Sequence, residues 1–132
     1  MAKWELLYEI VKNLGRGWKV DAGGLQDLGF FAGIASAPAG MELRFFAPTE
    51  KLDPSRERSY PPLGWLRVDG RLNFGNRGLS GGLSIELRDS MTPEELGNEL
   101  ILRFLPLYAD VLEIVEKHNS QHPEMGPDTL KI

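Results

Sequence analysis

The fold is decided by residues 83–104, LSIELRDSMTPEELGNELILRF. The first six of these residues alternate apolar and polar side chains, which is typical of a strand with one buried face. Thr92 and Glu95 stand three residues apart around Pro93, a pattern that indicates a capping box with proline at the first helical position. Because apolar residues then recur to near Asn119, the stretch predicts a strand followed directly by a long helix.

The predicted C-terminal helix is divided at Pro106. Apolar residues recur at helical spacing on both sides of this proline; they are Leu96, Leu100 and Phe104 before it and Tyr108, Val111, Leu112 and Val115 after it. Proline lacks the backbone N–H that a helix uses, and its ring crowds the carbonyl of Leu102, four residues earlier. We therefore expect a kink or a break at this point.

Upstream of this stretch, the pattern predicts one more helix and several short strands. Residues 3–14 are expected to form an amphipathic helix that ends at Gly15. Its apolar face would hold Trp4, Leu7, Tyr8, Val11 and Leu14. Short strands are predicted within residues 17–21, 28–35, 41–46, 65–74 and 83–88.

Residues 65–74 are expected to form a hairpin with the loop Asp69-Gly70-Arg71. A three-residue loop would pair Val68 with Leu72 and Leu66 with Phe74, which makes one face wholly apolar, whereas a two-residue loop would mix apolar and polar residues on each face. The glycine-rich segment 75–82 precedes a strand rather than a helix, so it is interpreted as a flexible connection and not as a phosphate-binding loop.

Consecutive short strands joined by turns favour antiparallel pairing. The sequence therefore predicts an α+β fold: a single antiparallel sheet of about four to six strands packed against an N-terminal helix and a Pro-kinked C-terminal helical pair. A length of 132 residues is that of one domain, so residues 1–132 are taken as a single domain. Residues 119–132 are expected to be a loosely ordered tail.

Composition narrows the classes of function. The chain has no cysteine, which excludes disulfides, thiolate metal sites and cysteine nucleophiles. Neither a signal peptide nor a membrane span is recognisable, so a cytoplasmic protein is expected. The net charge of −4 is uneven, because residues 42–88 carry eight basic and six acidic side chains whereas residues 89–132 carry three basic and nine acidic ones. This polarity could orient a partner, although an acidic solvated helix face is the commoner explanation.

No catalytic constellation is evident. The serines lack a nucleophile-elbow context, and the carboxylate pairs fall on exposed helix positions where nothing raises a pKa. His118 and His122 are four residues apart and could ligate a metal, but two solvent-exposed histidines are the simpler interpretation. We therefore expect a protein that is not an enzyme and that has no cofactor and no metal site.

The more suggestive feature is the sheet face that would point away from the core. By alternation this face would carry Arg44, Phe46, Trp65, Arg67, Asn73, Glu86 and Arg88. Arginines beside aromatic rings form a platform that can stack and can pair with anions. An equally weighted alternative is that the N-terminal helix, with Trp4 and Tyr8, covers part of this face.

The long segment 48–64 is the second candidate for binding. It has no periodicity and contains four prolines, and loops of this length are usually functional or mobile. Arg56, Arg58 and Tyr60 lie in it, directly before Trp65, and arginine and aromatic residues dominate binding hot spots. We expect these three side chains to contact a partner without contributing to stability.

The strand, the Pro-Glu-Glu helix start and the run Leu102-Arg103-Phe104-Leu105-Pro106-Leu107-Tyr108 resemble the C-terminal part of small uncharacterised proteins encoded in phages, plasmids and actinobacterial genomes. The resemblance covers about a quarter of the chain and implies an origin in a mobile element, with no activity attached. Gly97 departs from the pattern, which tends to have a helix former at that position.

Three hypotheses of function follow. The first is a non-enzymatic protein-binding accessory or inhibitor factor, whose acidic helical region could engage a basic surface. The second is a nucleic-acid-binding module that uses the sheet face with Arg44, Trp65, Arg67 and Arg88, against which the net negative charge argues. The third and weakest is an enzyme with a metal at His118 and His122. The sequence gives no indication of the oligomeric state.

Overall fold

The computed structural model describes residues 3–22, 30–48, 61–74, 77–79 and 83–121. Its strands are β1 (Lys19–Ala22), β2 (Phe30–Ala37), β3 (Met41–Pro48), β4 (Trp65–Gly70), β5 (Leu72–Phe74), β6 (Arg77–Leu79) and β7 (Ser84–Arg88). Its helices are α1 (Lys3–Lys12), the short 3-10 helix η2 (Pro38–Gly40), α3 (Pro93–Glu99), the π-helical turn η3 (Leu100–Phe104) and α4 (Leu105–Gln121).

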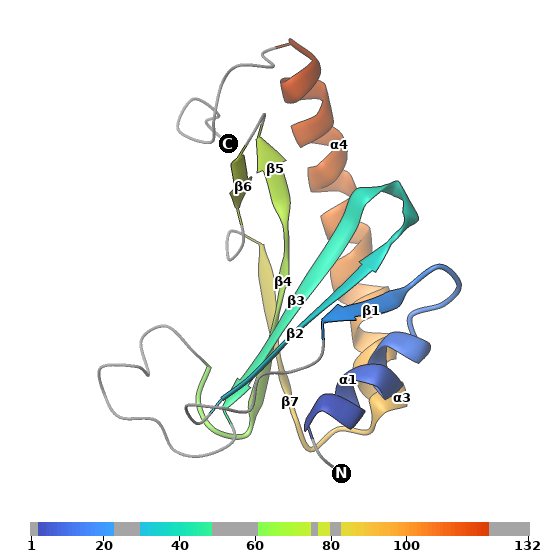
Figure 1. The fold of residues 1–132 in the computed structure, drawn as a ribbon, viewed down its shortest axis with the longest axis vertical. Coiled ribbons are helices and arrows are strands. Elements are labelled where there is room, and N and C mark those ends of the chain that lie inside the picture. Colours follow the sequence, from blue (N-terminus) through green and yellow to red (C-terminus); the bar gives the residue numbers. More distant parts are fainter. Residues whose placement is uncertain (1–2, 23–29, 49–60, 75–76, 80–82, 122–132) are drawn as a thin grey trace.

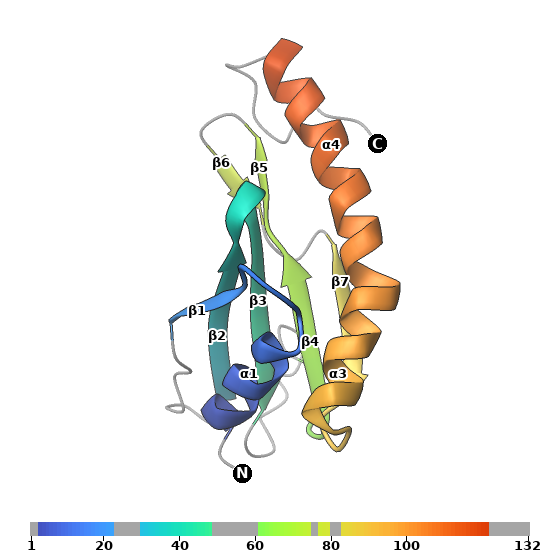
Figure 2. The ribbon, with the colours of Figure 1, turned by 90° about the vertical axis from the view of Figure 1, so that its right-hand side faces the viewer.

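The predicted α+β architecture is confirmed. Five antiparallel strands form one sheet in the order β1-β2-β3-β4-β7, and β5 and β6 form a separate two-stranded ribbon. Helices α1, α3 and α4 all lie on the same face of the large sheet (Figures 1 and 2). We call this the inner face, and the opposite side of the large sheet the outer face.

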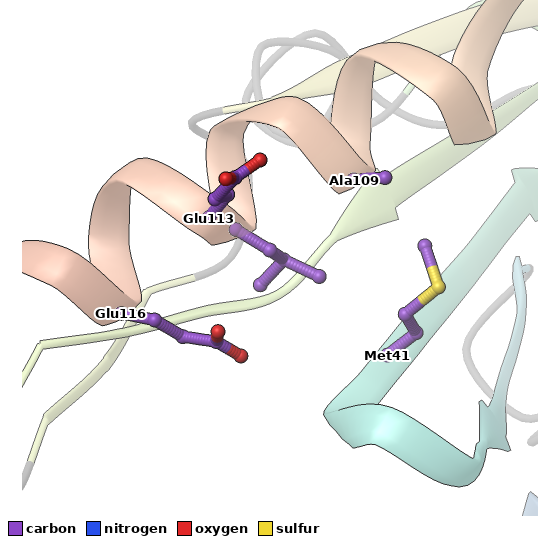
Figure 3. Close-up of a pocket in the computed structure, with 5 residues that line it drawn as sticks. Met41, Ala109, Glu113 and Glu116 are labelled. Carbon is purple, nitrogen blue, oxygen red and sulfur yellow. The ribbon is translucent and has the colours of Figure 1, made fainter.

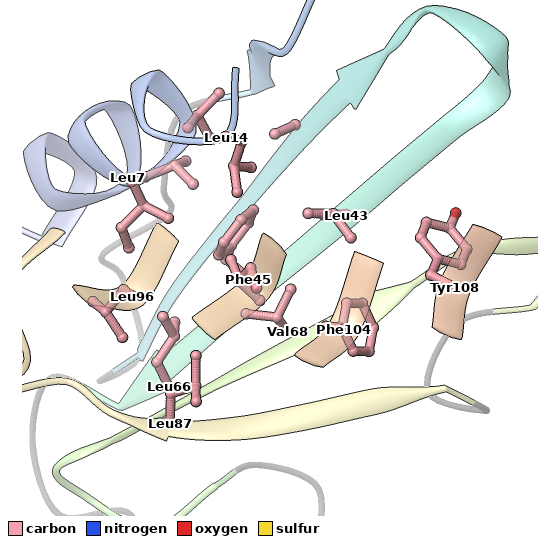
Figure 4. Close-up of a cluster of buried hydrophobic side chains, with 14 of the residues drawn as sticks. Leu7, Leu14, Leu43, Phe45, Leu66, Val68, Leu87, Leu96, Phe104 and Tyr108 are labelled. Atoms are coloured by element: carbon pink, nitrogen blue, oxygen red, sulfur yellow. The ribbon is translucent and has the colours of Figure 1, made fainter. Parts of the chain in front are cut away.

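The core lies between the inner face and the helices (Figure 4). Alternate residues of the central strands point into it, as the period of two requires; they include Leu43, Phe45, Leu66, Val68 and Leu87. The helices contribute Leu7, Ile10, Val11, Leu14, Leu96, Leu100, Phe104, Tyr108 and Val115. Burial of each large side chain contributes roughly 1.5–3 kcal/mol, so this single cluster holds the layers together.

Helix α1 packs on the inner face, which corrects two predictions. It does not cover the outer face, because its buried residues belong to the same cluster as Phe45 and Leu96. Its buried stripe contains Ile10 rather than Tyr8, whose side chain is 51% exposed. Helix α1 ends at Lys12, two residues before the predicted end at Leu14. One further turn follows, in which Leu14 N–H donates to the carbonyl of Val11, and Gly15 then has a positive φ of 108°.

The junction between β7 and α3 forms as predicted. The Thr92 hydroxyl accepts from Glu95 N–H at 3.1 Å, and the Glu95 carboxylate accepts from Thr92 N–H at 3.1 Å. These two bonds satisfy donors that the first helical turn leaves without intrahelical partners. Pro93 occupies the first turn, where its missing N–H has no consequence.

The predicted kink at Pro106 is a π-helical turn. Leu105 N–H donates to the carbonyl of Leu100, five residues back, and this wider turn directly precedes the proline. A widened turn makes room for the ring beside the carbonyl of Leu102, so the helix continues without a break. Phe104 and Tyr108 therefore stay on the buried face on either side of the proline.

The predicted hairpin at residues 65–74 is wrong. Strand β4 is central in the sheet, with β3 on one side and β7 on the other, so neither of its edges is free to pair with residues 72–74. The chain instead continues past Arg71, whose N–H donates to the carbonyl of Glu42, and enters β5. Leu72 is still buried, as the apolar pattern suggested.

Strand β5 pairs with β6, which lies inside the segment that was interpreted as a flexible connection. Phe74 is paired with Arg77, so only Gly75-Asn76 separates the two strands, a composition that two-residue hairpins favour. The ribbon contacts the end of α4, because the Asn119 side-chain amide donates to the carbonyl of Asn73 at 2.6 Å. The predicted tail therefore starts later than residue 119, and residues 122–132 lie outside the described part of the chain.

Tyr108 joins the helix layer to the sheet. Its hydroxyl donates to the carbonyl of Arg71 at 2.6 Å, lies 3.1 Å from the carbonyl of Glu42 and accepts from Glu42 N–H at 3.2 Å. Its ring lies against Gly70, where an added Cβ would be 2.8 Å from a ring carbon. Burial raises the pKa of Tyr108, which keeps the hydroxyl protonated and able to donate.

Replacing Tyr108 with phenylalanine should destabilise the protein by about 1–3 kcal/mol, because the Arg71 carbonyl and Glu42 N–H would lose a buried partner while the ring remained. Urea unfolding monitored by circular dichroism measures this change. Tyr8→Phe serves as the control, since Tyr8 is 51% exposed and Tyr108 is fully buried, and it should have a smaller effect. Equal stability of the Tyr108→Phe variant and the wild type would contradict the anchoring role.

Gly97 is required by the contact between α3 and the end of α1. A Cβ at this position would be 2.7 Å from the Cβ of Asn13, which is fixed to the backbone and cannot rotate away. This contact explains why a helix former is absent from the middle of α3.

Gly97→Ala should therefore destabilise the protein, although alanine improves helix propensity by about 1 kcal/mol. The overpacking is expected to outweigh that gain, at about 1–3 kcal/mol. A double-mutant cycle with Asn13→Gly, measured by thermal unfolding, isolates the contact, since removal of the Asn13 Cβ should abolish most of the penalty. A stabilising Gly97→Ala substitution in the wild-type background would refute the close contact.

Candidate interaction surface on the outer sheet face

The outer face is built by the residues that alternate with the core positions. Strands β3, β4 and β7 place Arg44, Phe46, Trp65, Arg67, Asp69, Glu86 and Arg88 on it. No helix of the described part of the chain covers these residues (Figure 2). The sequence therefore predicted the two faces of these strands correctly.

Cross-strand register creates two arginine–aromatic stacks. Phe46 is opposite Arg67, and the Arg67 guanidinium lies 4.9 Å from the Phe46 ring centroid. Trp65 is opposite Arg88, and the Arg88 guanidinium lies 4.1 Å from the Trp65 ring. Each ring is thus shielded from water on one side by a cation, which makes partly exposed aromatic residues tolerable on this face.

Arg88 differs from the other arginines of the face. Its side chain is exposed, and within the described residues no acidic group pairs with it. Its planar fork of donors is held over Trp65 and is therefore pre-organised to bind a carboxylate with two parallel hydrogen bonds. This arrangement makes Arg88 the residue of the face that is best placed to bind an anionic group.

Arg67 holds a buried carboxylate. Asp69 is 2% exposed, and its Oδ1 lies 3.2 Å from the Arg67 Nε. Burial raises the pKa of Asp69, while the charges of Arg67 and Arg44 oppose that shift. Asp69 was not among the predicted site residues, because the expected hairpin placed it in a loop, although its spacing of two from Arg67 already put both side chains on one face of the strand.

Glu42 neutralises a second part of the surface. Its carboxylate lies 3.1 Å from the Arg44 Nε and 3.7 Å from the Arg71 Nε. The Arg71 Nε also donates to the Asn73 side chain at 3.3 Å. Asn73 itself lies in β5, so it belongs to the β5–β6 ribbon and not to the predicted sheet face. Arg44 is therefore engaged in an internal ion pair, unlike Arg88.

The structure thus brings together four of the predicted binding residues: Arg44, Trp65, Arg67 and Arg88. The other three, Arg56, Arg58 and Tyr60, lie outside the described residues. So does His122, the second histidine of the metal-site hypothesis, and in the described part of the chain no three His, Cys, Asp or Glu side chains are grouped as metal ligands would be. None of the described helices is long and apolar enough to cross a membrane.

Comparison with known proteins gives no relative. No protein-family model, no curated protein sequence and no solved structure matches this chain.

The buried Asp69 should leave a signature in the pH dependence of stability. Because its pKa in the folded protein lies above the ordinary value of 3.8, the native state holds a proton that the unfolded state has already released. The contribution of Asp69 to the free energy of unfolding should therefore fall as pH rises from 3.8 through the raised pKa.

Asp69→Asn tests this expectation, because the variant cannot titrate at this position. Its stability relative to the wild type should rise with pH across the same window, as measured by urea unfolding at a series of pH values. Glu94→Gln, at an exposed position on α3, is the matched control. A stability difference between the Asp69→Asn variant and the wild type that is constant with pH would show that Asp69 titrates normally.

Proposed function

We propose that this chain is a non-enzymatic protein-binding module whose outer face receives an acidic segment of a partner protein. The observation that carries the proposal is the stack of Arg88 on Trp65, an exposed and pre-organised guanidinium on a face that no described helix covers. Arginine and tryptophan are enriched among the residues that dominate protein interfaces. The neighbouring stack of Arg67 on Phe46 extends the same platform.

A protein partner suits this face better than a nucleic acid. Proteins that stack bases on a sheet use aromatic rings whose faces are open, and here an arginine covers one side of each ring. Glu42 and Asp69 also pair with Arg44 and Arg67, so these two arginines are not free to neutralise the several phosphates that a nucleic-acid backbone presents. A short acidic peptide can instead place one carboxylate on Arg88 and its apolar atoms against Trp65.

Nucleic-acid binding is the second candidate, and one observation favours it. The acidic residues of α3 and α4 lie with their helices on the inner side of the sheet, away from the outer face (Figure 2). Their repulsion of phosphates is therefore weaker at this face than the net charge alone suggests. The Arg88→Gln variant described below is tested with both peptides and oligonucleotides to distinguish the two candidates.

We further propose that the module acts in the cytoplasm as an accessory or inhibitor factor encoded by a mobile element. This proposal rests on the resemblance of residues 83–119 to small proteins of phages and plasmids and on the absence of cysteine.

A peptide-display selection on the immobilised protein tests the proposal. Enriched peptides should carry aspartate or glutamate, and their affinity should fall about tenfold in Arg88→Gln, the effect expected for loss of one strong interface contact. Arg103→Gln is the matched control, because Arg103 is an exposed arginine on the helix layer. The triple variant Arg56→Ala, Arg58→Ala and Tyr60→Ala should weaken binding in the same assay with little change in melting temperature.

Two results would count against the proposed function. The first is enrichment of peptides that bind Arg88→Gln and the wild type equally. The second is binding of single- or double-stranded oligonucleotides at low salt that depends on Arg88, which would favour the second candidate.

A further inference from the structure

A recess separates α4 from the start of β3, on the inner side of the sheet. It has a volume of about 170 Å³ and is lined by Met41, Ala109, Leu112, Glu113 and Glu116. Figure 3 shows Met41 on one side of the gap and the three labelled α4 residues, Ala109, Glu113 and Glu116, on the other. The lining is therefore apolar at three residues and carboxylate-bearing at two.

The two carboxylates of the recess are not neutralised by the described residues. Glu113 and Glu116 are exposed, and neither forms an ion pair within the described part of the chain. Lys117 stands four residues after Glu113, a spacing that allows a helical ion pair, yet no such pair forms. The surrounding segment 89–121 holds seven acidic and two basic residues, so it carries a formal net charge of −5.

We propose that this recess binds a lysine or arginine side chain from a basic segment of a partner protein. The long aliphatic stem of such a side chain would lie against Met41, Ala109 and Leu112, and its cationic head would reach the carboxylates of Glu113 and Glu116. Methionine suits the opposite wall, because its flexible thioether adapts to side chains of different shape. The apolar stem and the charged head of the bound side chain would thus each contact residues of matching polarity.

This site is independent of the proposed acidic-peptide site. It lies on the opposite side of the sheet from Arg88 and prefers ligands of the opposite charge. Arg88→Gln should therefore leave it unaffected, and failure of one proposal leaves the other standing.

The experiment uses hexalysine as the probe and the full chain labelled with ¹³C at its methionine methyl groups. Titration at low salt should shift the Met41 methyl resonance, while Met91, two residues before α3, provides an internal reference. The double variant Glu113→Gln and Glu116→Gln should bind about fivefold more weakly, the scale of two solvent-exposed ion pairs. The double variant Asp110→Asn and Glu94→Gln removes the same charge from exposed positions that do not line the recess, and it should bind like the wild type.

Two altered peptides test the two halves of the site. Acetylation of the lysines keeps the stem and removes the charge, and diaminobutyrate in place of lysine keeps the charge and shortens the stem. Both peptides should bind more weakly than hexalysine. The proposal is overturned if Met41 does not respond, if both double variants lose affinity equally, or if the short-stem peptide binds as well as hexalysine.

Discussion

The Tyr108 hydroxyl is the contact on which the arrangement of the layers depends. It ties α4 to the backbone at the point where β3 begins and β4 ends, through Glu42 and Arg71. The Tyr108 ring lies so close to Gly70 that a Cβ at this position would be 2.8 Å from a ring carbon, so the close approach of α4 requires glycine here. Met41 precedes Glu42 in the sequence and Ala109 follows Tyr108, so the same contact brings Met41 and Ala109 to opposite sides of the recess. This anchor thus fixes the position of α4 over the start of β3, and with it the inner surface proposed for basic side chains.

The outer face depends on register rather than on a helix. Only one alignment of β3, β4 and β7 places Phe46 opposite Arg67 and Trp65 opposite Arg88, and a slip of one residue would turn these side chains into the core. The inner alternation of Phe45, Val68 and Leu87 holds this alignment, because it buries their side chains. The hydrophobic core therefore specifies the recognition surface indirectly, by fixing which side chains meet on the opposite face.

Local signals in the sequence were sufficient for some elements and not for others. The capping box at Thr92, the faces of β3, β4 and β7 and the disturbance at Pro106 follow from residues within a few positions of one another. The prediction of a hairpin at residues 65–74 was wrong because the local alternation of apolar and polar residues does not show which strands pair. Both edges of β4 are taken by β3 and β7, which are distant in sequence. The burial of Asp69 and the choice of Ile10 over Tyr8 depend on the same long-range packing. Four of the seven predicted binding residues share one face because alternation along a strand determines the side to which each residue points, whereas their positions opposite one another depend on register.

The two proposed sites, at Arg88 and at the recess beside α4, present side chains of opposite charge on opposite sides of the sheet. Arg88 offers donors on the outer face, whereas Glu113 and Glu116 offer acceptors beside α4. A partner with an acidic segment would meet the sheet, and a partner with a basic segment would meet the helices. Since the sheet lies between the two sites, both could be occupied at once, and the chain would then act as a bridge between partners of unlike charge.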